Sequence, residues 1–240
     1  MQKSQPTPDG GYLQENRMES ERNVEACSIS CGETDGKDGV FYVIDKIASR
    51  TNLNRAYEKV KANKGAAGVD GMNVQELYAY LVLNKRTLIS EIKDGSYEPS
   101  PVRRAEIDKE DGSKRKLGIP TVKDRLVQQA ILQVLERTID PTFSDNSFGF
   151  RPNRNAHDAI RRAKEYYEEG HRTVVDIDME QYFDTVNHDK LMYHIGEHVE
   201  DPVVLRLIRK FLRSGVSVDG AVYPTEIGCP QGGGSLPSTE

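Results

Sequence analysis

Two carboxylates, Asp176 and Asp178, stand two residues apart in a short run of β-forming residues, and the aromatic Phe183 follows five residues after the second. Alternate residues of a strand share a face, so both carboxylates would leave on one side while Val175 and Ile177 face a core on the other. Carboxylate oxygens are the ligands that a hard cation such as Mg²⁺ prefers. The pattern predicts a cation site, with a solvated strand end before a turn as the alternative.

Basic residues crowd a second region, which the pattern predicts to be two strands, residues 102–109 and 114–119, around an Asp-Gly turn signal. The parity of these strands allows Arg103, Lys109 and Arg115 to gather on one face over a small apolar base. Guanidinium groups bind phosphate through paired hydrogen bonds, so this face suits a polyphosphate. The alternative is an edge strand that charged side chains protect from pairing with another chain.

Aromatic residues and arginines alternate in a third region, residues 147–154, which precedes a predicted helix. Aromatic rings beside guanidinium groups suit the bases and the backbone of a single nucleic-acid strand. The alternative is that the rings are buried anchors that fix the start of the helix, and this interpretation is the favoured one for Phe148 and Phe150.

A glycine-rich segment, residues 228–234, lets another backbone or a base approach closely, because glycine carries no β-carbon. It lacks the Lys-Ser/Thr ending of a phosphate-binding P-loop. The chain also lacks the Gly-x-Ser-x-Gly pattern of a serine nucleophile elbow. These two absences direct attention away from P-loop nucleotide hydrolysis and serine hydrolysis.

The residues His194, Glu197 and His198 match the His-x-x-Glu-His pattern of inverted zinc peptidases. On a helix, their spacing would place both histidines on one face, as zinc binding requires. However, Gly196 weakens the helix, Ile195 belongs to an apolar stripe, and no partner helix offers a third ligand. A zinc peptidase is therefore only a remote alternative.

The composition sets the class of protein. The chain has 240 residues, a formal net charge of −5 and three cysteines, which form no even disulfide framework. No apolar run has the length of a signal peptide or a membrane span. These features predict a cytoplasmic protein without a membrane partner, and the acidic balance argues against a uniformly basic nucleic-acid binder.

The elements that must position these residues follow from caps and periodicity, and together they predict an α+β fold. The apolar spacing and the glycine and proline stops indicate six helices. The first covers residues 53–62, the second is capped by Asn73 and ended by Gly95, and the third is capped by Thr121 and ended at Asp140-Pro141. The fourth is capped by Asn155 and ended by Gly170, the fifth runs through Leu191 and Ile195, the sixth runs from Asp201-Pro202 to Gly215, and Asp219-Gly220 turns a last hairpin.

Taken in order, the segments resemble the group II intron reverse transcriptase/maturases. The resemblance runs from about residue 53 to residue 233 and rests on five blocks, namely residues 64–71, 116–125, 147–152, 178–184 and 230–233. It implies helices packed on short antiparallel sheets in a reverse-transcriptase fingers and palm. The domains would be a flexible leader over residues 1–38, fingers over 39–172, a partial palm over 173–233 and a non-matching tail over 234–240.

The resemblance also assigns roles. Asp178, with the backbone carbonyl of Met179, would bind metal in a two-metal Mg²⁺ centre for nucleotidyl transfer, and Asp178 would be catalytic. Phe183 would select deoxynucleotides by rejecting a 2′-hydroxyl. The other residues for which a dNTP role is implied are Lys109, Arg115 and Gln231, and those for template or RNA binding are Arg103, Ile119, Lys64, Arg151 and Arg154.

The implied function is that of an RNA-directed DNA polymerase, bacterial and cytoplasmic, that copies RNA into cDNA and whose parent also acts as a splicing maturase. Its partners would be group II intron RNA, an RNA template with a DNA primer and dNTPs, with a possible homodimer. The chain contains no Tyr-x-Asp-Asp turn, so we expect the palm to be truncated and this chain to be inactive alone. The alternative of a different class is a non-catalytic module that binds intron RNA for splicing.

Overall fold

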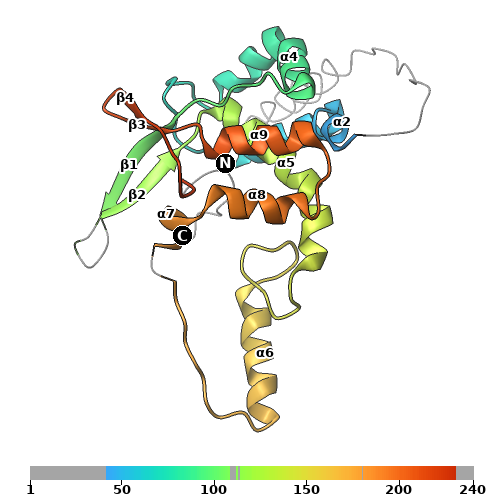
Figure 1. Ribbon diagram of the computed structural model, residues 1–240, viewed down its shortest axis with the longest axis vertical. Helices are drawn as coiled ribbons and strands as arrows, with labels where there is room; N and C mark the ends of the chain where they lie inside the picture. The colour runs from blue at the N-terminus through green and yellow to red at the C-terminus, as the bar shows by residue number, and fades with distance from the viewer. Residues whose placement is uncertain (1–41, 109–111, 113, 180, 231–240) are drawn as a thin grey trace, which may run out of the picture. The chain divides into compact units, whose positions relative to one another are not determined.

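The computed structural model describes residues 42–108, 112, 114–179 and 181–230, which belong to a compact unit running from residue 41 to residue 240. The predictions for Lys109, Gln231, the leader over residues 1–38 and the tail over 234–240 lie outside these residues. Helices and short strands are mixed along the described chain, so the predicted α+β class is confirmed (Figure 1).

The elements follow the predicted order except at residues 174–179, where the predicted strand is not formed. They are α2 (Val43–Ile47), α3 (Arg50–Ala62), α4 (Glu76–Asp94), β1 (Val102–Asp108), β2 (Lys114–Ile119), α5 (Val122–Ile139), the 3₁₀ turn η1 (Asp140–Thr142), α6 (Ala156–Glu168), α7 (Tyr182–Thr185), α8 (His188–Gly196), α9 (Pro202–Leu212), β3 (Val216–Val218) and β4 (Ala221–Tyr223). Within the described ranges, no helix combines the length and the apolar character needed to cross a membrane.

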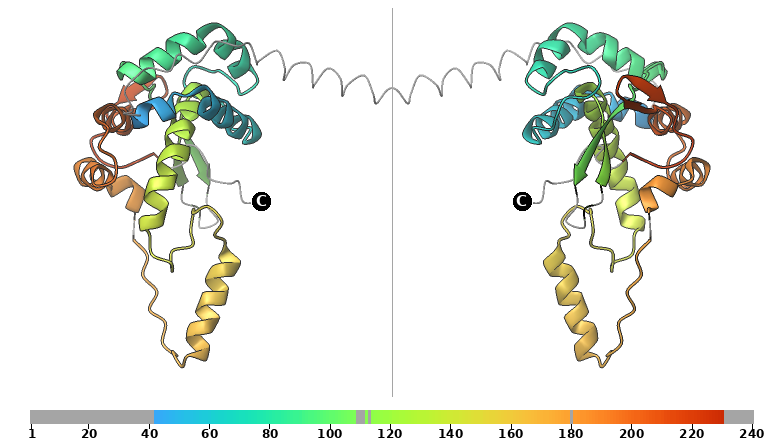
Figure 2. Two further views of the ribbon diagram at one scale, coloured as in Figure 1. Left: turned by 90° about the vertical axis from the view of Figure 1, so that its right-hand side faces the viewer. Right: turned by 90° about the vertical axis from the view of Figure 1, so that its left-hand side faces the viewer.

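Helix α5 lies at the centre of the hydrophobic core. Its side chains Val122, Leu126 and Val127 are buried, and α3 packs against one side of it. Helix α9 contributes Val204 and Leu207 to the same buried cluster from the other side (Figure 2). The 3.6-residue period that predicted α5 from the sequence therefore corresponds to burial on more than one side.

Side-chain hydrogen bonds near the predicted capping residues mark the starts of α4, α5, α6 and α9. Asn73 and Glu76 exchange hydrogen bonds at the start of α4, and the hydroxyl of Thr121 accepts from the N–H of Asp124 at the start of α5. Asn155 forms a full capping box at α6, and the carboxylate of Asp201 caps α9. These local contacts explain why the helix boundaries can be read from the chain.

One mixed sheet, in the order β2-β1-β3-β4, takes the place of the short antiparallel sheets that the sequence predicted. The hairpins β1-β2 and β3-β4 are antiparallel, as expected, but β1 pairs with β3 in parallel, with Val102 opposite Val216. This pairing joins residues far apart in sequence, so no turn signal announces it. It fixes the basic hairpin against the last strands of the described chain.

The segment of residues 174–179 is extended and exposed, and the strand predicted there is not formed. Val174, Val175 and Ile177 are 91%, 77% and 83% exposed, so no core receives the apolar side of the pattern. A strand needs a hydrogen-bonded neighbour for its backbone groups, and no strand of the described chain pairs with this segment. The predicted fingers and palm boundary at residue 172 stays a prediction.

Candidate functional site

The loop that follows β4, residues 224–230, docks on α7 through its backbone, and this contact builds one half of the candidate site. The N–H of Gly228 donates to the carbonyl of Val186 at 2.8 Å, and the N–H of Cys229 donates to that of Phe183 at 2.6 Å. A β-carbon on Gly228 would lie 2.8 Å from the carbonyl oxygen of Asp184, and its φ is +83°. Glycine is therefore required here, and the predicted close backbone approach is confirmed at this position.

The same loop reaches the basic hairpin at Pro230. A β-carbon on Gly118 would lie 2.6 Å from the β-carbon of Pro230 and 2.9 Å from a methyl carbon of Val102, so only glycine fits without a shift of these neighbours. Three predicted motifs thus meet at one junction, namely β2, α7 and the β4 loop. Gln231 lies outside the described residues, but it follows Pro230 directly in the chain.

The opposite face of the hairpin holds the loop of residues 64–71, here called the N-terminal loop. Arg103 donates to the carbonyl oxygen of Ala67 from Nε at 3.1 Å and from Nη2 at 2.8 Å. A β-carbon on Gly68 would lie 2.6 Å from the backbone of Thr121. Lys64 stands exposed at the start of this loop. RNA binding by Arg103 and Lys64 stays a prediction. In the structure, Arg103 holds the N-terminal loop against the hairpin.

A second guanidinium, that of Arg125 on α5, also binds the N-terminal loop. Its Nη2 donates to the carbonyl oxygen of Ala66 at 2.6 Å. Burial lowers the pKa of this guanidinium from its ordinary value, and the nearby carboxylate of Asp70 partly offsets that effect. The loop is therefore fixed by two arginines acting on neighbouring carbonyl groups.

The register of the hairpin confirms which residues share a face. Arg103 pairs with Ile119, and Ile107 pairs with Arg115, so all four lie on one face, as parity predicted. Arg115 is exposed and Ile119 is half-buried. Binding of dNTPs by Arg115 and of template by Ile119 stays a prediction.

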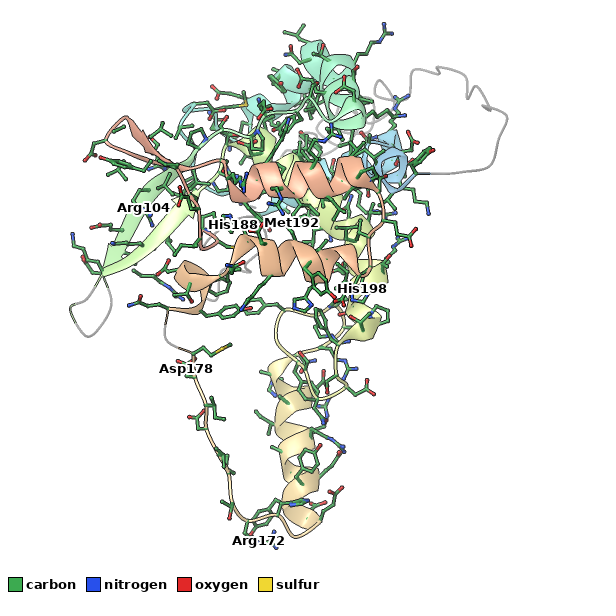
Figure 3. The ribbon with its side chains drawn as sticks, in the orientation of Figure 1. Arg104, Arg172, Asp178, His188, Met192 and His198 are labelled. Carbon is green, nitrogen blue, oxygen red and sulfur yellow. The ribbon has the colours of Figure 1, made fainter. Side chains whose placement is uncertain are left out.

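Asp178 and Met179 lie exposed on the extended segment that leads to α7 (Figure 3). Phe183 is 46% exposed in α7, and its ring lies 5.5 Å from that of Tyr182. In the part of the chain that the structure describes, no three His, Cys, Asp or Glu side chains come together as a metal site. As the structure places them, Asp178 and Met179 do not by themselves form a two-metal centre.

Arg151 organises the loop between η1 and α6. Its side chain is 7% exposed, and Nε donates to the carboxylate of Asp140 at 2.8 Å. Its Nη1 donates to the carbonyl oxygens of Ser144 and Ser147, at 2.7 and 3.2 Å. This closes the loop around one guanidinium, as a buried charge requires partners. RNA binding by Arg151 stays a prediction.

One aromatic residue of this loop, Phe150, differs from the favoured expectation, whereas Phe148 is half-buried. Phe150 is 83% exposed with φ +56°, so it is not the buried anchor that the sequence suggested. Arg154 lies with its guanidinium carbon 5.7 Å from the ring centre of Phe148, and it donates to the backbone and carboxylate of Asp145. Arginine, rather than a buried ring, fixes the loop. RNA binding by Arg154 stays a prediction.

The zinc-peptidase pattern does not form a site. Helix α8 ends at Gly196, so Glu197 and His198 lie beyond its last turn, and the two histidines do not share a helical face. The imidazole Nδ1 of His194 lies 3.0 Å from the carboxylate of Glu197, and both side chains are exposed. The weak helix propensity of Gly196 explains this end, and the zinc alternative is wrong in this respect.

Two residues of the junction, Gly118 and His188, were not predicted from the sequence. Gly118 lies within residues 116–125, but a lone glycine in a strand indicates only that another group approaches closely and does not identify that group. His188 is 4% exposed, and its Nε2 lies 2.7 Å from the carbonyl oxygen of Gly228. In Figure 3 the β4 loop runs between the hairpin, where Arg104 is labelled, and the start of α8, where His188 is labelled. Nothing local in the sequence marks this contact.

The chain is similar to several known proteins. It is 38% identical to Protein YkfC of Escherichia coli (strain K12) over 178 residues, covering 72% of this chain and 47% of that protein. It is 37% identical to the group II intron-encoded protein LtrA of Lactococcus lactis subsp. cremoris over 214 residues, covering 85% of this chain and 34% of that protein. The chain therefore spans less than half the length of these relatives.

A solved structure supports the fold. A chain of a partial Cas6-RT-Cas1–Cas2 complex matches with a TM-score of 0.52 and 19% identity, covering 80% of this chain and 32% of that one. At this identity the match concerns the fold alone. The family described as reverse transcriptase (RNA-dependent DNA polymerase) matches residues 107–239, which include β2, α7 and the β4 loop. The chain belongs to the reverse transcriptase family.

Proposed function

We propose that this chain is part of an RNA-directed DNA polymerase of the group II intron type, which copies RNA into cDNA with dNTPs and whose parent also acts as a splicing maturase. The observation that carries the proposal is the junction of β2, α7 and the β4 loop at Gly118, Phe183 and Gly228. The intron-encoded relative supports the group II assignment.

The junction supports specific roles. Pro230 brings the end of the β4 loop against β2, and Gln231, the next residue in the chain, is the one we propose to help position the nascent base pair. Phe183 accepts a backbone hydrogen bond from Cys229, so the aromatic residue and this loop are held together at the base of the same site. Arg115 and Lys109 would bind the triphosphate, since guanidinium and ammonium groups neutralise phosphate charge. Phe183 would exclude a 2′-hydroxyl.

Metal binding at Asp178 is part of the proposal only as a ligand that this chain contributes. A cation there would supply charge neutralisation for phosphoryl transfer. The partners we propose are intron RNA, an RNA template with a DNA primer, and dNTPs. The homodimer and the cytoplasmic, bacterial location stay predictions.

Crosslinking tests the proposal. The purified chain is mixed with an RNA template and a DNA primer, and labelled dTTP or UTP is crosslinked by ultraviolet light. We expect more crosslinking with dTTP than with UTP, and Phe183→Ala should reduce this preference because the residue that excludes the 2′-hydroxyl is gone. Tyr193→Ala, at an exposed aromatic residue outside the junction, is the matched control.

Binding to RNA is measured in parallel by fluorescence anisotropy at several salt concentrations. Lys64→Ala, at an exposed residue proposed to bind RNA, should weaken binding and reduce the salt slope, because counterion release scales with the phosphates neutralised. RNA binding without any nucleotide crosslinking would favour the non-catalytic splicing module. Absence of both activities would refute the proposal.

A further inference from the structure

His188 is the first residue of α8 and contacts the β4 loop. It is 4% exposed, and its Nε2 lies 2.7 Å from the carbonyl oxygen of Gly228, a residue 40 positions away in the chain. Asn187 caps α8 by accepting from the N–H of Lys190, and it also forms an antiparallel bridge with Ile227. The histidine therefore projects from a backbone that is fixed on both sides.

The hydrogen-bond partners define the state of the imidazole ring. A carbonyl oxygen only accepts, so the Nε2–H of His188 must donate the hydrogen bond to the carbonyl oxygen of Gly228. Its Nδ1 is buried and has no hydrogen-bond partner among the described residues. An N–H at that atom would be buried without an acceptor, which is costly, so the Nε2–H tautomer is favoured over the Nδ1–H tautomer.

Both backbone groups of Gly228 are held by this short stretch of chain. Its N–H donates to the carbonyl of Val186 at 2.8 Å, and its carbonyl accepts from His188 at 2.7 Å. The next N–H, that of Cys229, donates to Phe183. These hydrogen bonds fix the position of the β4 loop relative to α7, and Pro230 places the end of the same loop against β2.

We propose that His188 is a positioning residue for nucleotide binding, because its hydrogen bond to Gly228 sets the place of the β4 loop relative to Phe183. The expected effect on nucleotide binding rests on the proposed function, in which the β4 loop contacts the incoming nucleotide. Its structural part, the coupling of His188 to the loop, can be measured without any nucleotide.

The thiol of Cys229 reports on this coupling, because it is half-buried in the loop and burial raises its pKa. In a Cys27→Ser, Cys31→Ser background, alkylation by iodoacetamide measures how often the loop opens. His188→Ala should speed alkylation about tenfold, as expected for the loss of one buried hydrogen bond. His188→Gln retains an N–H donor and should restore most of the protection. His198→Ala, at an exposed histidine, is the matched control.

Nucleotide crosslinking separates positioning from folding alone. His188→Ala should raise the dTTP concentration that gives half-maximal crosslinking while the anisotropy-derived affinity for RNA stays the same, and His188→Gln should reverse the shift. Histidine ring ¹⁵N resonances of the unsubstituted chain should show the Nε2–H tautomer, which keeps a test available if the alanine variant does not fold.

Alkylation rates that are equal in the unsubstituted chain and in His188→Ala would overturn the inference, as would an Nδ1–H tautomer. An equal loss of RNA and dTTP binding in His188→Ala would also contradict it, because that result describes a general structural role. If the unsubstituted chain crosslinks no nucleotide, the proposed function fails, while faster alkylation of His188→Ala still supports the coupling of histidine and loop.

Discussion

Replacing Tyr97 by phenylalanine removes one hydrogen-bond donor from a buried carboxylate and leaves the ring in place. The hydroxyl of Tyr97 donates to Oδ1 of Asp124 at 2.7 Å, and both side chains are 1% exposed. The ring lies 6.1 Å from that of Phe211, a contact that phenylalanine retains. The carboxylate keeps two other donors, the hydroxyl of Thr121 at 2.6 Å and the N–H of Ser100 at 3.2 Å.

The size of the effect depends on the charge of Asp124. A hydrogen bond to a charged group contributes about 1.5–3 kcal/mol, against about 0.5–1.5 kcal/mol for a neutral pair. Burial raises the pKa of Asp124 from its ordinary value, and the hydrogen bonds from Thr121 and Tyr97 oppose that rise. Burial also raises the pKa of Tyr97, so its hydroxyl stays a donor. Tyr97→Phe should therefore raise the pKa of Asp124 further.

The sign of the pH dependence follows from linkage. A carboxyl whose pKa is raised on folding favours the folded state most below its unfolded pKa, and this contribution is lost as pH rises through the folded pKa. Because Tyr97→Phe moves the folded pKa upward, the variant loses more stability at neutral pH than at acid pH. The expected loss is about 1.5–3 kcal/mol where Asp124 is ionised and about 0.5–1.5 kcal/mol where it is protonated.

Urea unfolding followed by far-ultraviolet circular dichroism measures the change, since the chain has no tryptophan. The free energies of unfolding are compared at pH 7 and at the lowest pH at which both proteins remain folded. Tyr193→Phe, at a residue 68% exposed, should leave stability unchanged and serves as the control. Equal stability of Tyr97→Phe and the unsubstituted chain at neutral pH, or a larger loss at acid pH, would refute the reasoning.

Three further substitutions are measured by the same unfolding assay. Gly68→Ala should cost about 1–3 kcal/mol, because its β-carbon would lie 2.6 Å from the backbone of Thr121, whereas Gly149→Ala, with no neighbour within 4 Å, should cost far less. Leu207→Ala, at a fully buried position, should cost about 2–5 kcal/mol, and a smaller loss would contradict the packing of α9 on the core. Ile177→Thr, at a residue 83% exposed, should stay within about 0.5 kcal/mol, and a larger loss would show that this segment packs.

Local signals explain the parts of the fold that the sequence predicted. Asn73, Thr121, Asn155 and Asp201 accept hydrogen bonds from backbone groups two or three residues ahead, so their position alone marks a helix start. The β1-β2 hairpin is likewise local, and its parity determines which residues share a face. These interactions need no knowledge of the rest of the chain.

Non-local contacts explain what the sequence did not predict. The parallel pairing of β1 with β3 joins residues such as Val102 and Val216, which no turn connects. The roles predicted for Arg103 and Arg151 in binding template or RNA stay predictions, and the structure adds contacts that the sequence did not predict, because their guanidinium groups bind carbonyl oxygens and a carboxylate of the chain itself. Arginine chemistry is the same in both roles, so residue type alone cannot separate them.

The junction and the aspartate segment differ in how they are held. Gly118 and Gly228 fix the junction through backbone and β-carbon contacts, which are complete within the described residues. The segment of residues 174–179 has no such contacts, and its alternating Val175 and Ile177 are exposed together with Asp178. A strand that pairs with this segment would order its backbone, and a core on one face would then bury the apolar residues and aim the carboxylates at the other. Burial of Val175 and Ile177 would therefore also determine where Asp178 points, because alternate side chains of a strand lie on opposite faces.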